Sequence, residues 1–268
     1  MKFSIVIANY NSGKLLEECI CSVLSQNFYD YEIIMVDAGS TDESKQTILK
    51  YKEYFSWWCS EKDNGQSDAF NKGFSHANGD YFFWLNADDF LLPHALRKAS
   101  VFIDEHPLCK WITFNTIFVD SNRRVMFTYN GCKWINSIMK RIGPQVDAPT
   151  SIFHRNIYED SNKFDINLYY AMDIDLWLQF MYLGYSYKRI NCYFYAFRIH
   201  EGSKTASEGF TKKTQNPEKI RQGKIIQDKY SFYPEKFKMW ILLNKIIKLF
   251  CYKPLSFITT LRLKGKTI

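Results

Sequence analysis

Residues 3 to about 100 alternate between short apolar segments and longer segments in which apolar residues recur every three or four positions. The short segments are rich in β-branched and aromatic residues, as buried strands are, and the longer ones have helical spacing. The predicted strands are residues 3–8, 32–36, 55–59 and 81–85. The predicted helices are residues 14–26, a segment from the cap cluster at 40–43 to about 53, residues 67–77 and a segment after Pro93. This alternation indicates a mostly parallel sheet flanked by helices.

Beyond residue 110 the pattern changes to a local strand pair. Residues 111–119 and 124–129 predict a β-hairpin around the polar turn at 120–123. The remaining predicted elements are a helix at about 173–183, a strand at about 187–198, and helices at about 211–230 and 236–251. We therefore expect the second half of the chain to form a different wall of any binding site.

The composition is that of a folded globular protein. Hydrophobic residues make up 46% and aromatic residues 18% of the 268 residues, which is far too apolar for a disordered chain. The seven cysteines include no C-x-x-C pair and fit neither a disulfide framework nor a zinc site, so a reducing cytoplasm is the expected compartment. The apolar run at 3–8 is too short for a signal peptide, and no stretch reaches the roughly 18 apolar residues of a membrane span. We expect neither export nor a transmembrane helix.

The net charge of +7 is unevenly distributed along the chain. Residues 211–268 hold 14 Lys and Arg against three Asp and Glu, a net charge of +11, which leaves −4 for residues 1–210. In this tail the basic residues are interleaved with apolar and aromatic ones between Phe237 and Phe250, and no nucleic-acid reader motif accompanies them. The pattern favours contact with an anionic membrane surface. The alternative is a basic helix that packs on the main domain.

Two of the predicted strands lead to acidic residues. The strand at 81–85 is followed by Asp88 and Asp89, and the strand at 32–36 by Asp37. In open α/β sheets, ligands bind beyond the carboxyl ends of the strands. Two carboxylates are few for a cation site made of protein alone, so a Mg²⁺ ion held there would complete its coordination with substrate phosphates. The alternative is that the acids cap the following helix.

Residues 62–73 concentrate polar side chains, among them Asp63 and Asp68, in a turn that opens a helix. Such donors and acceptors can bind a nucleobase or ribose, and the alternative is ordinary turn and capping chemistry. The nucleotide loops G-x-G-x-x-G and G-x-x-x-x-G-K-[ST] are absent, so neither a dinucleotide oxidoreductase nor a P-loop enzyme is expected. Metal-assisted binding of phosphates explains the acids better.

Four segments with this polar character follow one another along residues 3–90. They are Ser4-Ile5-Val6-Ile7-Ala8-Asn9-Tyr10-Asn11, Val36-Asp37-Ala38-Gly39-Ser40-Thr41-Asp42, Asp63-Asn64-Gly65-Gln66-Ser67-Asp68 and Leu85-Asn86-Ala87-Asp88-Asp89. Together they resemble the successive signatures of inverting family 2 glycosyltransferases, and the resemblance covers residues 3 to 206. It implies a GT-A fold, an α/β fold whose Rossmann-like, mostly parallel central sheet is flanked by helices, here with a C-terminal basic helical extension. The implied division is a glycosyltransferase domain at 1–210, with a nucleotide-sugar half (1–110) and an acceptor and catalytic half (111–210), and a basic amphipathic extension at 211–268.

The resemblance assigns nucleotide-sugar binding to residues near the strand ends. Asn9 and Tyr10 would line the base pocket. Asp37 would contact the ribose or base, and Asp63 would hydrogen-bond the base, which we expect to be uracil. Asp68, in the same turn as Asp63, is also assigned to the donor.

The D-x-D element of the family falls on residues 86–88. Asp88 would bind Mg²⁺ or Mn²⁺, while Asn86, Ala87 and Asp89 would lie at the donor. Asn86 replaces the first acid of the element, which keeps an oxygen but loses a charge. The resemblance also implies that His200 approaches the metal or diphosphate, although a lone histidine is more often structural.

Asp173 occupies the position of the family's catalytic base, with Met172 where an acid often stands. A base must reach the acceptor hydroxyl as that hydroxyl attacks the anomeric carbon. Asp175 is the second candidate, and helix capping is the alternative reading of both acids. Gln145 is the residue assigned to the acceptor site.

The expected activity is the metal-dependent, inverting transfer of a sugar from a UDP-sugar to a glycan acceptor. We expect a lipid-linked acceptor in surface polysaccharide biosynthesis, with the enzyme peripheral on the cytoplasmic face of the membrane through its basic tail, and no nucleic-acid partner. Two other classes stay open, a catalytically inactive nucleotide-sugar or glycan binding module and a sugar-phosphate nucleotidyltransferase. Release of UDP would distinguish transfer from binding, and diphosphate release with formation of a nucleotide sugar would indicate the nucleotidyltransferase.

Overall fold

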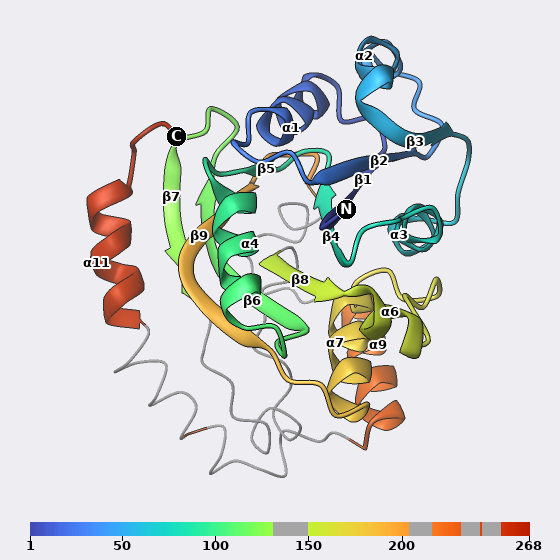
Figure 1. The fold of residues 1–268 in the computed structure, drawn as a ribbon, viewed down its shortest axis with the longest axis vertical. Helices are drawn as coiled ribbons and strands as arrows, with labels where there is room; N and C mark the ends of the chain where they lie inside the picture. Colours follow the sequence, from blue (N-terminus) through green and yellow to red (C-terminus); the bar gives the residue numbers. More distant parts are fainter. Residues whose placement is uncertain (131–149, 204–215, 232–241, 243–252) are drawn as a thin grey trace.

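A nine-stranded sheet forms the centre of the protein. The computed structural model describes residues 1–130, 150–203, 216–231, 242 and 253–268. The strands are β1 (Phe3–Asn9), β2 (Tyr31–Asp37), β3 (Phe55–Ser60), β4 (Tyr81–Asn86), β5 (Phe90–Leu91), β6 (Trp111–Val119), β7 (Val125–Tyr129), β8 (Ser151–His154) and β9 (Lys188–Arg198). Within the described residues their order is β3-β2-β1-β4-β8-β6-β9-β5, and β7 pairs with β6 beside this path. Figure 1 shows helices on both sides of this sheet.

The first half of the sheet is parallel, as the alternation of strands and helices predicts. β1 pairs in parallel with β2 and β4, and β2 pairs in parallel with β3. The helices of this half are α1 (Lys14–Leu24), α2 (Ser44–Tyr51) with the 3-10 turn η1 (Lys52–Tyr54), α3 (Gln66–Ser75) and α4 (Ala95–Glu105). Every strand and helix predicted for this half is therefore confirmed, with ends that shift by a few residues as is usual for such boundaries.

The second half of the sheet is mixed. The predicted hairpin is present as the antiparallel pair β6 and β7, and β9 pairs with β6 in parallel. β8 lies antiparallel between β4 and β6 and so joins the two halves of the sheet. β8 was not predicted from the sequence, because four residues are too few to display a strand period.

Helices cover both faces of the sheet and divide the core into two layers. The alternating side chains of β1 show the division: Ile5 and Ile7 pack with residues of α1 and α4, whereas Val6 packs with residues of α3. α3 lies very close to β1 at Gly73, where an added Cβ would approach Val6 Cγ1 to 2.3 Å. The absence of a side chain at Gly73 therefore sets how closely α3 packs on the sheet.

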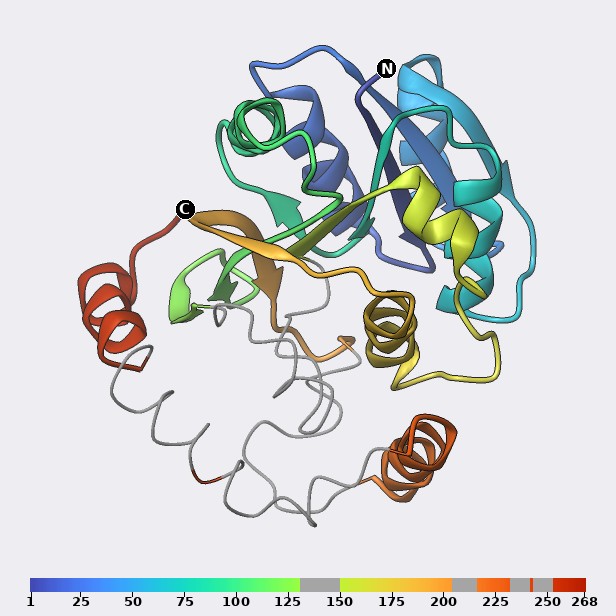
Figure 2. The same ribbon diagram turned by 60° about the horizontal axis from the view of Figure 1, so that its bottom comes forward.

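The helices of the second half are α6 (Arg155–Asp160), α7 (Met172–Tyr182), α9 (Pro217–Lys229) and α11 (Lys253–Leu263). α7 and α9 correspond to the helices predicted at 173–183 and 211–230, of which residues 211–215 lie outside the described part of the chain. The helix predicted at 236–251 also lies outside it, apart from Leu242. α11 was not predicted; it lies beside β7, as Figures 1 and 2 show in red and green. In the described ranges, no helix has the length and apolar character needed to cross a membrane.

Candidate active site

The carboxyl ends of the parallel strands bring several predicted donor residues together. Asn9 at the end of β1 is the register partner of Asp37 at the end of β2, and Asn86 at the end of β4 is the partner of Ala8. These residues share one edge of the sheet because their strands run in the same direction. Asn9, Asp37 and Asn86 therefore lie at neighbouring positions along this edge.

Asp37 is fully buried and holds the ends of three strands together. Its Oδ1 accepts hydrogen bonds from Asn9 Nδ2 (2.6 Å) and Ser40 Oγ (2.5 Å), and its Oδ2 accepts from Ser40 N (3.0 Å) and Ser60 Oγ (2.6 Å). Burial by itself raises the pKa of Asp37, but the hydrogen bonds from Ser40, Ser60 and Asn9 outweigh it and lower the pKa. Asp37 is thus an ionised acceptor inside the protein, and its contact with the ribose or base stays a prediction.

Tyr10 and Asp63 lie in the loops that follow β1 and β3, and Asp68 lies in the first turn of α3. The Tyr10 side chain is 67% exposed. Asp63 accepts a hydrogen bond from Gly65 N (2.8 Å), and burial raises the pKa of Asp63. Asp68 accepts hydrogen bonds from the backbone and side chain of Asn64, each at 3.0 Å. These contacts order the turn before α3, and donor binding by Asp63 and Asp68 stays a prediction.

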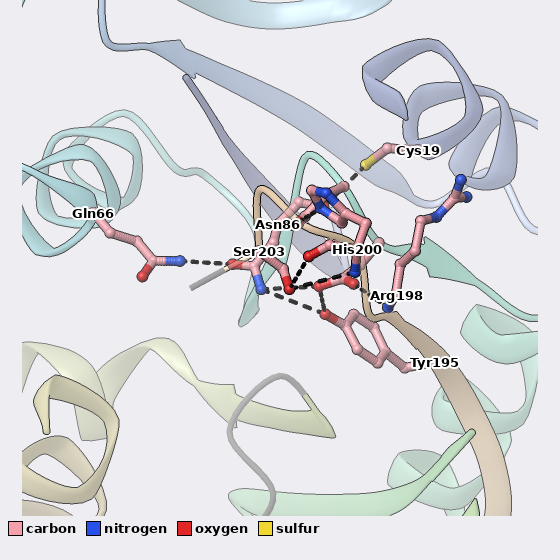
Figure 3. A network of polar contacts seen from close by, with 9 residues as sticks. Cys19, Gln66, Asn86, Tyr195, Arg198, His200 and Ser203 are labelled. Carbon is pink, nitrogen blue, oxygen red and sulfur yellow. Dashed lines mark hydrogen bonds and ion pairs between the residues drawn. The ribbon is translucent and has the colours of Figure 1, made fainter. Parts of the chain in front are cut away.

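Asn86 lies at the centre of the polar network in Figure 3. Its Oδ1 accepts a hydrogen bond from Gln66 Nε2 (2.8 Å), and its Nδ2 donates to Asp89 Oδ2 (2.9 Å). A carboxylate at position 86 has no hydrogen to donate and would face a second acid. The amide that replaces the family's first acid therefore connects the first residue of α3 to Asp89.

Asp89 faces into the protein, with 1% of its surface exposed. Its Oδ1 accepts from Arg198 N (2.7 Å), and its Oδ2 accepts from the Tyr195 hydroxyl. Burial and then the charge of Asp88 raise the pKa of Asp89, while the hydrogen bonds from Tyr195, Arg198 and Asn86 oppose this shift. Asp89 therefore joins the loop after β4 to the end of β9, and its predicted place at the donor stays a prediction.

Asp88 and His200, the two residues assigned to the metal, form a pair. His200 Nε2 lies 3.0 Å from Asp88 Oδ2, and the side chains are 22% and 26% exposed respectively. A carboxylate oxygen and an imidazole nitrogen suit a divalent ion such as Mn²⁺. Among the residues that the structure describes, no three His, Cys, Asp or Glu side chains cluster as a metal site. The pair would therefore need oxygens from substrate or water to complete the coordination.

Neither Gln66 nor Tyr195 was assigned to the site from the sequence. Arg198 is 1% exposed, and its guanidinium donates to Glu18 Oε2 in α1 (2.6 Å). The signal for Tyr195 was its position, because it lies near the end of the predicted strand that leads to His200. Gln145, assigned to the acceptor, lies outside the described residues.

The first turn of α7 carries both candidates for the base. Asp173 is partly exposed, and its Oδ1 accepts from Ile174 N (2.8 Å). Asp175 is 0% exposed and pairs with Lys229 Nζ at 2.7 Å. The structure thus separates the two acids, since Asp175 is buried in an ion pair whereas Asp173 reaches the surface.

Two consecutive residues of α3 link the first turn of α7 to Asn86, which precedes Asp88 and Asp89. Gln66 contacts Asn86, and Ser67 Oγ donates to the thioether of Met172 (3.1 Å) and to the Leu168 carbonyl (3.3 Å). Met172 is 6% exposed, so an acid in its place would be buried at a cost. The first turn of α7, the first two residues of α3 and the end of β4 therefore belong to one connected region.

A comparison with known families matches residues 4–156, more than half of the chain, to the model described as Glycosyl transferase family 2. A curated relative, an uncharacterized glycosyltransferase from Nostoc, is 41% identical over 101 residues, which are 37% of this chain and 31% of that protein. The chain spans less than two thirds of the length of the first curated relatives that it matches.

Solved structures give the same picture of the fold. The crystal structure of Staphylococcus aureus TarS 1–349 in complex with UDP-GlcNAc is 25% identical, with a TM-score of 0.61 over 77% of this chain and 61% of that chain. A mannosyltransferase from Pyrobaculum calidifontis, in complex with GDP-Man and Mn²⁺, is 15% identical and has a TM-score of 0.60 over 97% of this chain and 83% of that chain. The second likeness concerns the fold alone. Both support the predicted GT-A architecture.

Proposed function

The chain belongs to glycosyltransferase family 2 and is a glycosyltransferase of the GT-A type, and from this premise we propose that it moves one sugar from a UDP-sugar to a hydroxyl of a glycan acceptor. We propose a single displacement with inversion, in which the acceptor oxygen bonds to the anomeric carbon as the bond to the diphosphate breaks. No covalent sugar–enzyme intermediate is then required. The observation that carries the proposal is the connected region that joins Asn86, the Asp88–His200 pair and the first turn of α7.

The donor nucleotide is proposed to bind beyond the ends of β1 and β2, against the turn before α3. The buried Asn9–Asp37 pair would hold the backbone of this pocket, while the exposed Tyr10 and the partly exposed Asp63 would contact the base. The likeness to a structure that holds UDP-GlcNAc supports a UDP-sugar donor.

Asp88 and His200 are proposed to hold Mn²⁺ or Mg²⁺. A bound divalent ion would stabilise the negative charge that develops on the leaving diphosphate. Asp89 would keep Asp88 in position, because the hydrogen bonds from Tyr195 and Arg198 N fix the loop that carries both acids.

Asp173 is proposed to accept the proton of the acceptor hydroxyl as its oxygen attacks the anomeric carbon. Its place in the first turn of α7 suits an ionised carboxylate, because the helix dipole favours negative charge there. A well-positioned base of this kind accelerates a reaction by about 10²–10⁴-fold.

The acceptor is proposed to be a lipid-linked saccharide in surface polysaccharide biosynthesis, reached from the cytoplasmic face of the membrane. The most apolar part of the basic extension, at 237–250, lies outside the described residues apart from Leu242. Support comes from α11, where Phe257, Ile258 and Leu261 are 63%, 47% and 62% exposed. Arg262 is exposed beside them, and such a mixture of apolar and basic side chains suits an anionic membrane surface.

We would test the donor site by calorimetric titration of UDP into the full chain, with and without Mn²⁺. We expect binding that requires Mn²⁺, that is lost in Asp88→Ala, and that persists in the control Asp80→Ala at the opposite end of β4. Asp173→Asn should bind UDP like the wild type but lose about 10²–10⁴-fold in the hydrolysis of UDP-N-acetylglucosamine to UDP and N-acetylglucosamine, in which water takes the place of the acceptor hydroxyl. Equal UDP binding by Asp88→Ala would contradict the role of Asp88 in metal binding. Retained UDP release by Asp173→Asn would contradict the role of Asp173 as the catalytic base.

A further inference from the structure

Residues 216–231 lie against the first turn of α7, although they belong to the extension that the charge pattern set apart. Figure 1 shows α9 beside α7. Asp175 Oδ1 accepts from Lys229 Nζ (2.7 Å) and from the Tyr230 hydroxyl (2.9 Å), and its Oδ2 accepts from Gln179 Nε2 (2.7 Å). The carboxylate two residues after Asp173 is therefore held by two side chains from the end of α9.

The same segment contacts the chain on the other side of Asp173. Gln222, which is 1% exposed, accepts the backbone N–H of Tyr170 on its Oε1 (2.7 Å). Asn216 Nδ2 donates to the Tyr170 hydroxyl (2.9 Å). Contacts from α9 and its flanking residues therefore fall three residues before and two residues after Asp173.

The contacts from Lys229 and Tyr230 meet at a buried carboxylate, whereas the Lys229 side chain itself is 37% exposed. Asp175 is 0% exposed, and a buried carboxylate is tolerated only with donors around it. Burial, and then the neighbouring Asp175, raise the pKa of Tyr230, so its phenol stays protonated and donates. A charged lysine and a neutral phenol that share one carboxylate oxygen fix the position of Asp175.

We propose that residues 216–231 form a clamp that positions Asp173 for proton transfer, with Lys229 and Tyr230 as positioning residues. This inference rests on the proposed role of Asp173 as the base. Asp175 N donates to the Ala171 carbonyl (2.9 Å) in the same helical turn, so a shift of Asp175 would move the backbone that carries Asp173. Transfer of a proton depends on alignment within fractions of an ångström, so a small displacement of this turn lowers the rate without affecting the donor pocket.

The test compares Lys229→Met, which removes the charge, with Lys229→Arg, which restores it, and with Tyr230→Phe. Lys224→Met is the matched control, because Lys224 is an exposed lysine of the same helix. We expect Lys229→Met to lower kcat for hydrolysis of UDP-N-acetylglucosamine to UDP and N-acetylglucosamine, with water as the acceptor, about ten- to hundredfold while the Kd for UDP stays within about twofold. Lys229→Arg should recover most of kcat, Tyr230→Phe should lose less than Lys229→Met, and Lys224→Met should match the wild type.

Hydrogen exchange of the backbone amides supplies a second readout that needs no turnover. We expect the first turn of α7 to exchange faster in Lys229→Met than in the wild type, and to be unchanged in Lys224→Met. Unchanged exchange and unchanged kcat in Lys229→Met, with Asp173→Asn inactive, would overturn the clamp and leave the proposed function standing. An equal loss of kcat in Lys224→Met would also overturn it. If Asp173→Asn keeps its activity, the role of Asp173 is wrong and the clamp is withdrawn with it.

Discussion

Asn86 shows how one side chain sets the character of the candidate site. The family pattern has an acid at this position, but here the amide accepts from Gln66 and donates to Asp89. Asp89 is buried next to the charge of Asp88, and both effects raise its pKa. A donor at position 86 therefore stabilises a carboxylate that a third acid would destabilise.

Asn86→Asp should lower the free energy of unfolding by about 1–3 kcal/mol at pH 7, because it removes a donor from Asp89 and places a second carboxylate against it. The measurement is urea unfolding followed by fluorescence. Asn167→Asp is the control, since Asn167 donates to Asp165 in the same way (3.0 Å) but is exposed. The control should change stability by less than about 0.5 kcal/mol. Equal effects of the two changes would show that burial of Asp89 does not matter.

Among the elements, α3 links the core to the candidate site. Its first residues, Gln66 and Ser67, contact Asn86 and Met172, while Gly73 in its last turns lies against Val6 of β1. A shift of α3 away from the sheet would therefore also move Gln66 and Ser67, which connect the end of β4 to the first turn of α7. Helix propensity alone would favour alanine at position 73, so close packing decides the residue.

Gly73→Ala should destabilise the protein by about 1–3 kcal/mol, because the added methyl group overlaps Val6 Cγ1 at 2.3 Å. Gly223→Ala in α9 is the matched control, since an added Cβ there meets nothing within 4 Å. That control should stabilise the protein by about 0.5–1 kcal/mol, as alanine does in a helix. Urea denaturation of both variants checks the difference, and a stabilised Gly73→Ala would refute the packing argument.

At the scale of the whole molecule, the site is assembled from segments far apart in the chain. Asp88 follows β4, whereas His200 follows β9, and the two side chains pair at 3.0 Å. The basic extension at 211–268 contacts the rest of the protein at two places. Its helix α9 contacts α7, and its helix α11 lies beside β7. The side of α11 that contacts β7 carries Thr260, whose hydroxyl accepts a hydrogen bond from Thr128 N (3.0 Å). Phe257 and Leu261 of the same helix are exposed.

The membrane proposal predicts that the full chain sediments with vesicles containing anionic phosphatidylglycerol, and less with phosphatidylcholine alone. The double change Phe257→Gln and Leu261→Gln should weaken this binding at least about tenfold, because it removes apolar surface that would enter the lipid boundary. Tyr29→Gln with Leu108→Gln is the control, since these side chains are 88% and 95% exposed but lie outside the extension. Unchanged sedimentation of the α11 variant would exclude this helix as the contact.

The parallel half of the sheet follows from the sequence alone, because each strand and helix there displays its own period. The sequence also indicated that Asp37 and the acids after β4 follow strand ends, where ligands bind in sheets of this kind. The assignments of Asp88 and His200 came from a family resemblance, and their proximity is a property of the folded chain.

Which polar groups form hydrogen bonds with one another depends on the packing of distant segments. β8 is four residues long and pairs with β4 and β6, so its place depends on partners distant in sequence. Asp89 accepts from Arg198, 109 residues away, and Asp175 pairs with Lys229, 54 residues away. The spacing of apolar residues indicates which face of a helix or strand is buried. A hydrogen bond between distant segments, however, forms only when packing of the core has set the distance and orientation of the two groups. For this reason the sequence identified the acids, whereas packing decided that Asp175 is buried and Asp173 reaches the surface.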